Sequence, residues 1–274
     1  MKRRKVAKLG LFLVTCTVLI VYVFPFWIIL INSFKERRAI LDTPLAWPTA
    51  FSLENYLNAF ESMEFMSAIS NSLVITVSSL VITILFPAMF AYFLVRWKWK
   101  LNKWIFGVLV LSMLIPFQVV MIPFVNIFGG WNLLDSQGTL IFAYLGFGIA
   151  QATFLYHGFI KSLPVELEEA AMIDGASKLR VFFSVVFPML KPISSTIAIV
   201  NVLWFWNDFL LPSLVLQSPG NRTIPLSTSA FFGRFSTDFG SAMAALILAV
   251  IPMLVFYLIC QKQILKGMVE GALK

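Results

Sequence analysis

Charged side chains are scarce in this sequence. Asp, Glu, Lys and Arg make up 12% of its 274 residues, whereas 59% are hydrophobic and the mean hydropathy is +0.88. This composition is far from that of a soluble globular domain. Its charge-free stretches reach the length of about 17 to 25 residues that crosses the hydrocarbon core of a bilayer as a helix. The scarcity of charge therefore predicts a membrane protein with several spans.

Reactive and metal-binding residues are equally scarce. The two cysteines, Cys16 and Cys260, both lie in apolar stretches, which is typical of small buried side chains and not of a disulfide or metal framework. The single histidine, His157, lies near one end of an apolar stretch, so it is either interfacial or a proton carrier. No glycine is followed by lysine, which excludes a P-loop. The absence of a paired nucleophile, base or metal cluster also argues against a membrane-embedded enzyme.

Six stretches are long enough to span a membrane, at residues 9–31, 67–95, 104–126, 138–160, 193–216 and 241–261. They are too long and continuous for barrel strands, so helices are predicted. Sixteen of the 21 Lys and Arg fall on one side of these helices, and the positive-inside rule therefore places both termini in the cytoplasm. The predicted fold is an all-α polytopic membrane protein, with an N-terminal helix and outer loop (1–66) and a five-helix core (67–274).

Alternating basic and aromatic residues follow the second predicted helix, at residues 96–100. Such a pattern can bind single-stranded nucleic acid. It is more typical of the aromatic belt where a membrane protein meets lipid headgroups beside a basic cytoplasmic loop. We therefore predict membrane lipid and no nucleic acid as a partner of this segment.

Six prolines lie in or at the ends of the predicted helices: Pro25, Pro87, Pro116, Pro123, Pro212 and Pro252. A proline lacks the backbone N–H and bends a helix. Bent helices suit a bundle that opens alternately to either side, although proline is in any case more frequent in membrane helices.

The loop between the fourth and fifth predicted helices, about residues 161–192, is polar but regularly patterned. Pro164 and the three glutamates after it suit the start of a helix, and Gly175 suits a left-handed stop at its end. Ser177 can cap a second short helix. Two short helices that meet at a glycine form a rigid knob, and a rigid knob fixed to two spans can transmit movement.

The spacing of seven residues in this loop is specific: Glu169, Ala170, Ala171, Gly175, Val185, Phe187 and Pro188. It resembles the EAA motif (EAA, three residues, Gly, nine residues, IxLP) of permease subunits in binding-protein-dependent ABC importers. Val185 replaces Ile and Phe187 replaces Leu, and both exchanges are apolar. The resemblance covers most of the chain, including the strings IPFQVVMIP, LLDSQGTL and WNDFLLP, and looks closest to carbohydrate importers of the maltose and oligosaccharide type.

The resemblance implies that this loop is a coupling helix seated in a cleft of a separate ATPase subunit. The positions that carry over are Glu169, Ala170, Ala171, Asp174 and Gly175. Small residues also suit any short helix that packs closely on a neighbour, and the two interpretations are compatible. The chain itself would bind no cofactor or metal, because ATP and Mg would belong to the partner ATPase.

The resemblance also implies the rest of the assembly. The expected partners are two copies of the cytoplasmic ABC ATPase, a second related permease subunit that forms a hetero-dimer with this chain, and an extracytoplasmic solute-binding protein. Two outer segments, residues 51–60 and 217–240, are expected to face that protein or to form an interfacial helix and a lid. The expected location is the bacterial plasma (inner) membrane.

Asp208 is the only acidic residue clearly inside a predicted helix, which marks it as functional unless it reaches the interface. Together with Trp204 and Asn207 it forms a candidate substrate pathway, because sugars are bound by aromatic faces and polar groups. The predicted function is carbohydrate uptake, with a polyol, amino sugar or sugar phosphate as alternative solutes. A stand-alone ion-coupled secondary transporter is the alternative of a different class. Such transporters bury ionisable groups along their spans, and a single carboxylate is too few for an ion relay.

Overall fold

The computed structural model describes residues 2–232 and 238–272, and within these ranges it contains helices and turns but no strand. The all-helical prediction is therefore confirmed for this part of the chain. The chain divides into two compact units. Unit 1 comprises Met1–Phe65 and Ser227–Phe256, and unit 2 comprises Met66–Leu226 and Tyr257–Lys274.

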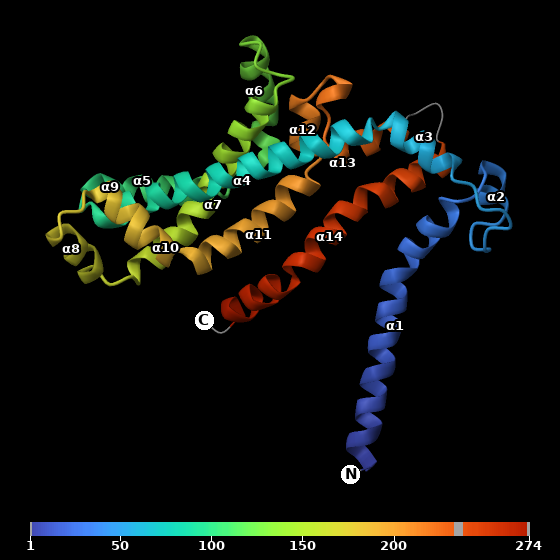
Figure 1. Cartoon of the computed structure of the whole chain (residues 1–274), viewed down its shortest axis with the longest axis horizontal. Coiled ribbons are helices and arrows are strands. Elements are labelled where there is room, and N and C mark those ends of the chain that lie inside the picture. The colour runs from blue at the N-terminus through green and yellow to red at the C-terminus, as the bar shows by residue number, and fades with distance from the viewer. Residues whose placement is uncertain (1, 233–237, 273–274) are drawn as a thin grey trace. The chain divides into compact units, whose positions relative to one another are not determined.

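Four helices in the described ranges are long and apolar enough to cross a membrane (Figure 1). They are α1 (Lys2–Asn32), α4 (Phe65–Arg96), α7 (Gln137–Lys161) and α14 (Phe239–Ala272). The candidate spans within α1 and α14 are Lys8–Asn32 and Phe239–Lys262. They coincide with the first, second, fourth and sixth predicted stretches. Their continuous apolar runs favour single helices, because a helix pairs its backbone groups within itself. Three of the four continue through an interior proline: Pro25 in α1, Pro87 in α4 and Pro252 in α14.

The third predicted stretch, 104–126, is broken and not continuous. It falls on α5 (Lys100–Ser112) and α6 (Phe117–Gly130), which meet at 100°. The break ends at Pro116, whose backbone is extended at φ −64° and ψ 141°. Proline lacks a donor and disfavours helical geometry in the residue before it, so the helix restarts after it. Four spans are thus unbroken, and there are up to six if each bent pair counts as one.

The fifth predicted stretch, 193–216, is also interrupted. It contains α11 (Lys191–Asn207) and α12 (Leu210–Val215), and α11 meets the segment before it at 74°. Asp208 ends α11 in an extended conformation. Its carboxylate Oδ1 accepts the Leu210 N–H at 3.1 Å, so it caps the start of α12.

The remaining helices are short. They are α2 (Arg37–Asp42), α3 (Glu54–Ser62), α8 (Glu166–Ile173), α9 (Lys178–Val181), the π-helix η1 (Phe182–Val186), α10 (Phe187–Met189), η2 (Pro219–Asn221), α13 (Ile224–Thr228) and η3 (Ser229–Phe231). The outer segment predicted at 217–240 contains η2, α13 and η3. Its residues 233–237, with the basic Arg234, lie outside the described residues.

In unit 1, hydrogen bonds fasten α3 to the end of α1. The Asn55 amide donates to the Ser33 backbone oxygen at 2.9 Å, and the hydroxyls of Ser33 and Tyr56 are 2.7 Å apart. The Asn55 bond satisfies a backbone oxygen left open where α1 ends, and the second bond joins two side chains. The segment predicted at 51–60 is therefore a folded helix and its connection, not a loose loop.

Unit 2 has two separate apolar cores. The first gathers side chains of α4, α7 and the loop helices, with its largest members Tyr92, Tyr156, Phe182 and Leu190. The second gathers mainly α4, α7, α11 and α12 side chains, among them Leu140, Tyr144, Phe205 and Leu211. The first core supports the loop after α7, whereas the second lies beneath the break between α11 and α12. Each core therefore underlies one of the two regions that the sequence marks as functional.

Candidate functional site

The loop after α7 forms the predicted pair of short helices, α8 and α9, which turn back on each other (Figure 1). Gly175 ends α8 with φ +85°, the left-handed geometry that glycine adopts without strain. Its N–H donates to the Met172 oxygen at 3.0 Å, and the Ala176 N–H donates to the Ala171 oxygen at 3.0 Å. The Ser177 hydroxyl accepts the Arg180 N–H at 3.4 Å. The predicted glycine stop and serine cap are confirmed, although α8 begins at Glu166, two residues after Pro164.

The predicted coupling residues lie on the outside of this knob. Glu169, Ala170, Asp174 and Gly175 are exposed, and Ala171 is half-buried against the first core. Large apolar side chains are exposed beside them, with Ile173 at 86% and Leu179 at 60% of their full accessibility. Apolar side chains exposed next to charged ones are typical of a surface that docks another protein.

A buried ion pair that the sequence did not reveal holds α8 to the end of α4. Glu168 is 4% exposed, and its Oε1 lies 2.8 Å from Arg96 Nε and 2.7 Å from Arg96 Nη2. The Tyr92 hydroxyl donates to Oε2 at 2.9 Å, and Arg96 Nη2 also donates to the Leu163 oxygen at 3.1 Å. Both carboxylate oxygens are therefore bonded. Removing one partner from such a pair costs about 3 to 5 kcal/mol, because the other charge stays buried.

The second loop helix is fastened to the same part of the chain. The Lys178 ammonium lies 4.7 Å from the centroid of the Trp97 ring, one residue beyond the end of α4. A cation over an aromatic face contributes about 0.5 to 1 kcal/mol at an exposed site. Both arms of the knob thus contact residues 92–97. Trp97, assigned from the sequence to an aromatic belt, also serves as this contact.

The three predicted substrate-pathway residues lie together but make different contacts. Trp204 of α11 lines a cavity of about 440 Å³. The Asn207 amide donates to the Leu203 oxygen of its own helix at 2.7 Å. Asp208 Oδ2 accepts the Tyr144 hydroxyl at 3.1 Å, in addition to its cap on α12. Of the three, Trp204 is the one that lines the cavity, whereas Asn207 is exposed outside its lining.

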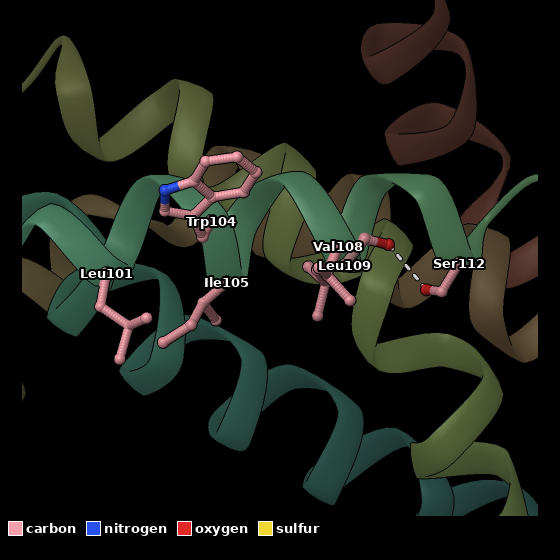
Figure 2. A pocket seen from close by; sticks show the side chains of 6 residues that line it. All are labelled: Leu101, Trp104, Ile105, Val108, Leu109 and Ser112. Atoms are coloured by element: carbon pink, nitrogen blue, oxygen red, sulfur yellow. Dashed lines mark hydrogen bonds between the residues drawn. The ribbon is translucent and has the colours of Figure 1, made fainter.

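A second hollow lies along α5 and differs in character from the Trp204 cavity. It measures about 450 Å³ and is lined by residues of one helix, as Figure 2 shows: Leu101, Trp104, Ile105, Val108, Leu109 and Ser112. Its one hydroxyl, on Ser112, donates to the Leu109 oxygen at 2.7 Å. A surface of this kind offers mainly apolar contact, with the Trp104 indole N–H and the Ser112 hydroxyl as its polar groups.

The turn between α6 and α7 is held by Asp135. Its carboxylate accepts the N–H groups of Gln217 and Ser218, each at 2.9 Å, the Ser218 hydroxyl, and the Asn221 amide at 3.2 Å. The hydroxyl and N–H of Ser218 stabilise the charged form most strongly, so they hold the pKa of Asp135 well below its usual value. This turn is thus tied to the segment after α12.

Among the side chains that the structure describes, no three His, Cys, Asp or Glu residues gather where they could hold a metal ion. Cys16 and Cys260 are free thiols. His157 is buried, and its ring stacks on Phe106 at 3.8 Å between centroids. This contact is that of a packed side chain.

Comparison with known proteins gives matches over most of the chain. Residues 83–269 match the family of binding-protein-dependent transport system inner membrane components. The probable starch degradation products transport system permease protein of Thermoanaerobacterium thermosulfurigenes is 40% identical over 255 residues, 93% of each chain. The melibiose/raffinose/stachyose import permease protein of Bacillus subtilis is 35% identical over 253 residues, 91% of each chain.

A solved structure has the same fold. The crystal structure of a bacterial ABC transporter involved in the import of the acidic polysaccharide alginate contains a chain that aligns with a TM-score of 0.78. The alignment covers 96% of this chain and 98% of that one, at 18% identity. At this identity the likeness concerns the fold alone.

Proposed function

This chain belongs to the family of binding-protein-dependent transport system inner membrane components, and from that premise we propose that it is a permease subunit for carbohydrate uptake. It is a transport protein and not an enzyme. The names of its relatives, permeases for starch degradation products and for melibiose, raffinose and stachyose, support an oligosaccharide as the solute. The observation that carries the proposal is the match over 93% of a 40% identical permease.

The proposed assembly follows from the family. The chain pairs with a second, related permease subunit, two copies of an ABC ATPase bind ATP and Mg on the cytoplasmic side, and a solute-binding protein delivers the sugar from outside. We propose six spans, two of them broken, with both termini in the cytoplasm of a bacterium, because Lys and Arg gather on that side. Residues 1–66 then form the first span and outer loop, and 67–274 form the permease core.

We propose that the knob formed by α8 and α9 is the contact with the ATPase. Its coupling residues, Glu169, Ala170, Ala171, Asp174 and Gly175, lie beside the exposed apolar side chains of Ile173 and Leu179. The small residues allow a close approach, and the apolar side chains supply area to bury. Docking on this face needs no rearrangement of the knob.

The buried ion pair explains how movement of the knob reaches the membrane helices. Glu168 lies on α8, and both its partners, Arg96 and Tyr92, lie on the last turns of α4. A pair with every carboxylate oxygen bonded cannot yield without exposing a buried charge, so α8 and α4 move together. Along α11, the sugar is proposed to pass Trp204, Asn207 and Asp208.

The coupling proposal is tested in the complete transporter, reconstituted into proteoliposomes with its ATPase and solute-binding protein. We expect Glu169→Ala to lower sugar uptake per ATP hydrolysed, because the variant removes an exposed charge at the docking face. Glu166→Ala is the matched control, because Glu166 is an exposed glutamate of the same helix outside the motif. Equal coupling in wild type and Glu169→Ala would refute the role of the knob. Uptake by the chain alone, driven by an ion gradient, would refute the importer itself.

A further inference from the structure

The cavity beside Trp204 lies where α5 and α6 break and where α7 passes the break. Its lining includes Ser112 and Met113 from the break, Phe117 of α6, and Gly146 and Gln151 of α7. Of the two hollows described above, this one is shared by several elements and contains polar groups. Its volume of about 440 Å³ falls within the range of about 300 to 1,000 Å³ typical of small-molecule sites.

Gln151 is the polar group that needs an explanation. It is the fifteenth of the 25 residues of α7, so it lies roughly 15 Å from the Lys161 end at about 1.5 Å per residue, near the middle of the span. Its side chain is exposed in the subunit, and no hydrogen bond joins its amide to another described residue. A primary amide has two donors and an acceptor, and leaving it unpaired in hydrocarbon is costly. The amide therefore needs a polar partner from outside the subunit, and the cavity that Gln151 lines is a place where one can approach.

The broken backbone lies at a similar depth. Twelve residues separate Lys100, at the basic end of α5, from Ser112, which is roughly 18 Å at the helical rise. Residues 112–116 are exposed in the subunit. Irregular backbone at membrane depth is tolerated where it lines a cavity or is covered by protein, and broken helices of transporters commonly line the solute site. The break and Gln151 thus indicate the same place.

The aromatic rings and the lack of charged side chains in the cavity lining determine which solutes the cavity can bind. Trp204 lines the cavity together with Phe117 and Phe147, whose ring centroids are 5.0 Å apart. None of the described residues that line it is Asp, Glu, Lys or Arg. A ring with an apolar face and several hydroxyl groups matches both the aromatic side chains and the amide. A phosphate or carboxylate would find no counter-charge on this subunit.

We propose that this cavity is the subunit's part of the carbohydrate site, in which Gln151 hydrogen-bonds the hydroxyls of a neutral sugar ring that packs against Trp204. The inference rests on the proposed function and adds the residue and the solute class. Asn207 and Asp208 then belong to the pathway beyond this site, because neither lines the cavity and their side chains bond the Leu203 oxygen, the Tyr144 hydroxyl and the Leu210 N–H.

The test uses the complete transporter in proteoliposomes, with raffinose and maltotriose as neutral probes and a galacturonate oligomer as the anionic one. ATP-driven uptake by the wild type is measured first, because its failure for every probe contradicts the proposed function rather than the cavity. With that established, Gln151→Leu should lower uptake of the transported neutral sugar by about five- to tenfold, the loss expected for one neutral hydrogen bond. Gln151→Asn should recover part of it.

Two further variants separate the site from general damage. A Cβ on Gly146 meets no atom within 4 Å, so Gly146→Ala should be near normal, whereas Gly146→Phe should fill the cavity and abolish uptake. Gln118→Leu removes another exposed amide, from α6 outside the cavity lining, and should leave uptake unchanged. Co-purification of the subunits should be normal in all variants, and basal ATP hydrolysis should be normal in Gln118→Leu.

Three results would overturn the proposal. The first is wild-type uptake of neutral sugar by both Gln151→Leu and Gly146→Phe. The second is loss of the partner permease from purified Gln151→Leu, which would make Gln151 a subunit contact. The third is a wild-type transporter that prefers the galacturonate oligomer, because the lining offers such a solute no positive charge.

Discussion

The two regions of unit 2 that we propose to be functional differ in how their polar groups are bonded. At the knob, Glu168 is buried and both its oxygens are bonded to Arg96 and Tyr92. At the cavity, the Gln151 amide is exposed and no described residue bonds it. A region that transmits force needs polar groups locked within the chain, whereas a region that binds a passing solute needs polar groups left open. The difference distinguishes a mechanical joint from a binding surface.

Breaking the buried ion pair should give the largest effect. Glu168→Ala leaves the Arg96 guanidinium and the Tyr92 hydroxyl without their partner, and we expect a loss of about 3 to 5 kcal/mol of stability together with loss of coupling. Thermal unfolding and uptake per ATP hydrolysed are the measurements. The double variant Arg96→Met/Glu168→Leu should regain stability, because an apolar pair removes both buried charges. An unchanged unfolding temperature in Glu168→Ala would show that the pair does not hold the knob.

A change at Gly175, where α8 ends, should cause a smaller loss of stability. Gly175→Ala should cost about 1 to 2 kcal/mol, the strain of a left-handed residue that carries a side chain. The added Cβ meets no atom within 4 Å, so backbone strain is the whole cost. Gly175→Asn should cost less, since asparagine tolerates this geometry. The unfolding temperatures of the two variants provide the check. Equal values would exclude the left-handed residue at the end of α8 as a source of the knob's rigidity.

A substitution of Asp208 tests whether this residue has a structural role at the start of α12 or a role in the sugar pathway. Asp208→Asn keeps an oxygen to accept the Leu210 N–H, so the α12 cap should survive and unfolding should change little. The charge is lost, and we expect a fall of a few-fold in uptake if the residue borders the sugar pathway. Sugar uptake as a function of concentration separates affinity from rate. Wild-type affinity and rate in this variant would leave Asp208 a structural cap.

The smallest effect concerns pH at Asp135. Its pKa is lowered in the folded protein, chiefly by the Ser218 hydroxyl and N–H, so the charged form stabilises the fold. This contribution is present above the unfolded pKa of about 4 and is lost as the pH falls through the lower folded pKa. The unfolding temperature should therefore drop on acidification more in the wild type than in Asp135→Asn. Parallel pH curves for the two proteins would contradict this assignment.

Local features of the fold were predictable from the sequence. Apolar runs located α1, α4, α7 and α14, and the glycine stop and serine cap of the knob were readable because each depends on neighbouring residues. Glu168 and Arg96, by contrast, lie 72 residues apart, and nothing local indicates which of three glutamates turns inward. Their pairing depends on how α8 packs against α4.

The cavity shows a different limit of sequence analysis. Pro116 was visible as a point of bending, but the size of the bend, 100°, depends on the packing of α6. Gln151 could have been found as an amide in the middle of an apolar run, a signal that a search for charges alone overlooks. Trp204 was predicted as part of the substrate pathway, and that assignment stays a prediction, now with a cavity at its face.

The π-helix η1 bears on how the loop tolerates changes in length. The Phe187 N–H bonds the Phe182 oxygen five residues back, so this turn contains one residue more than an α-helical turn. Both Phe182 and Val186 face the core, and Ser184 between them is exposed. Deleting Ser184 would let the turn close as ordinary α-helix with both flanks in phase, whereas deleting a residue of α8 would rotate the knob.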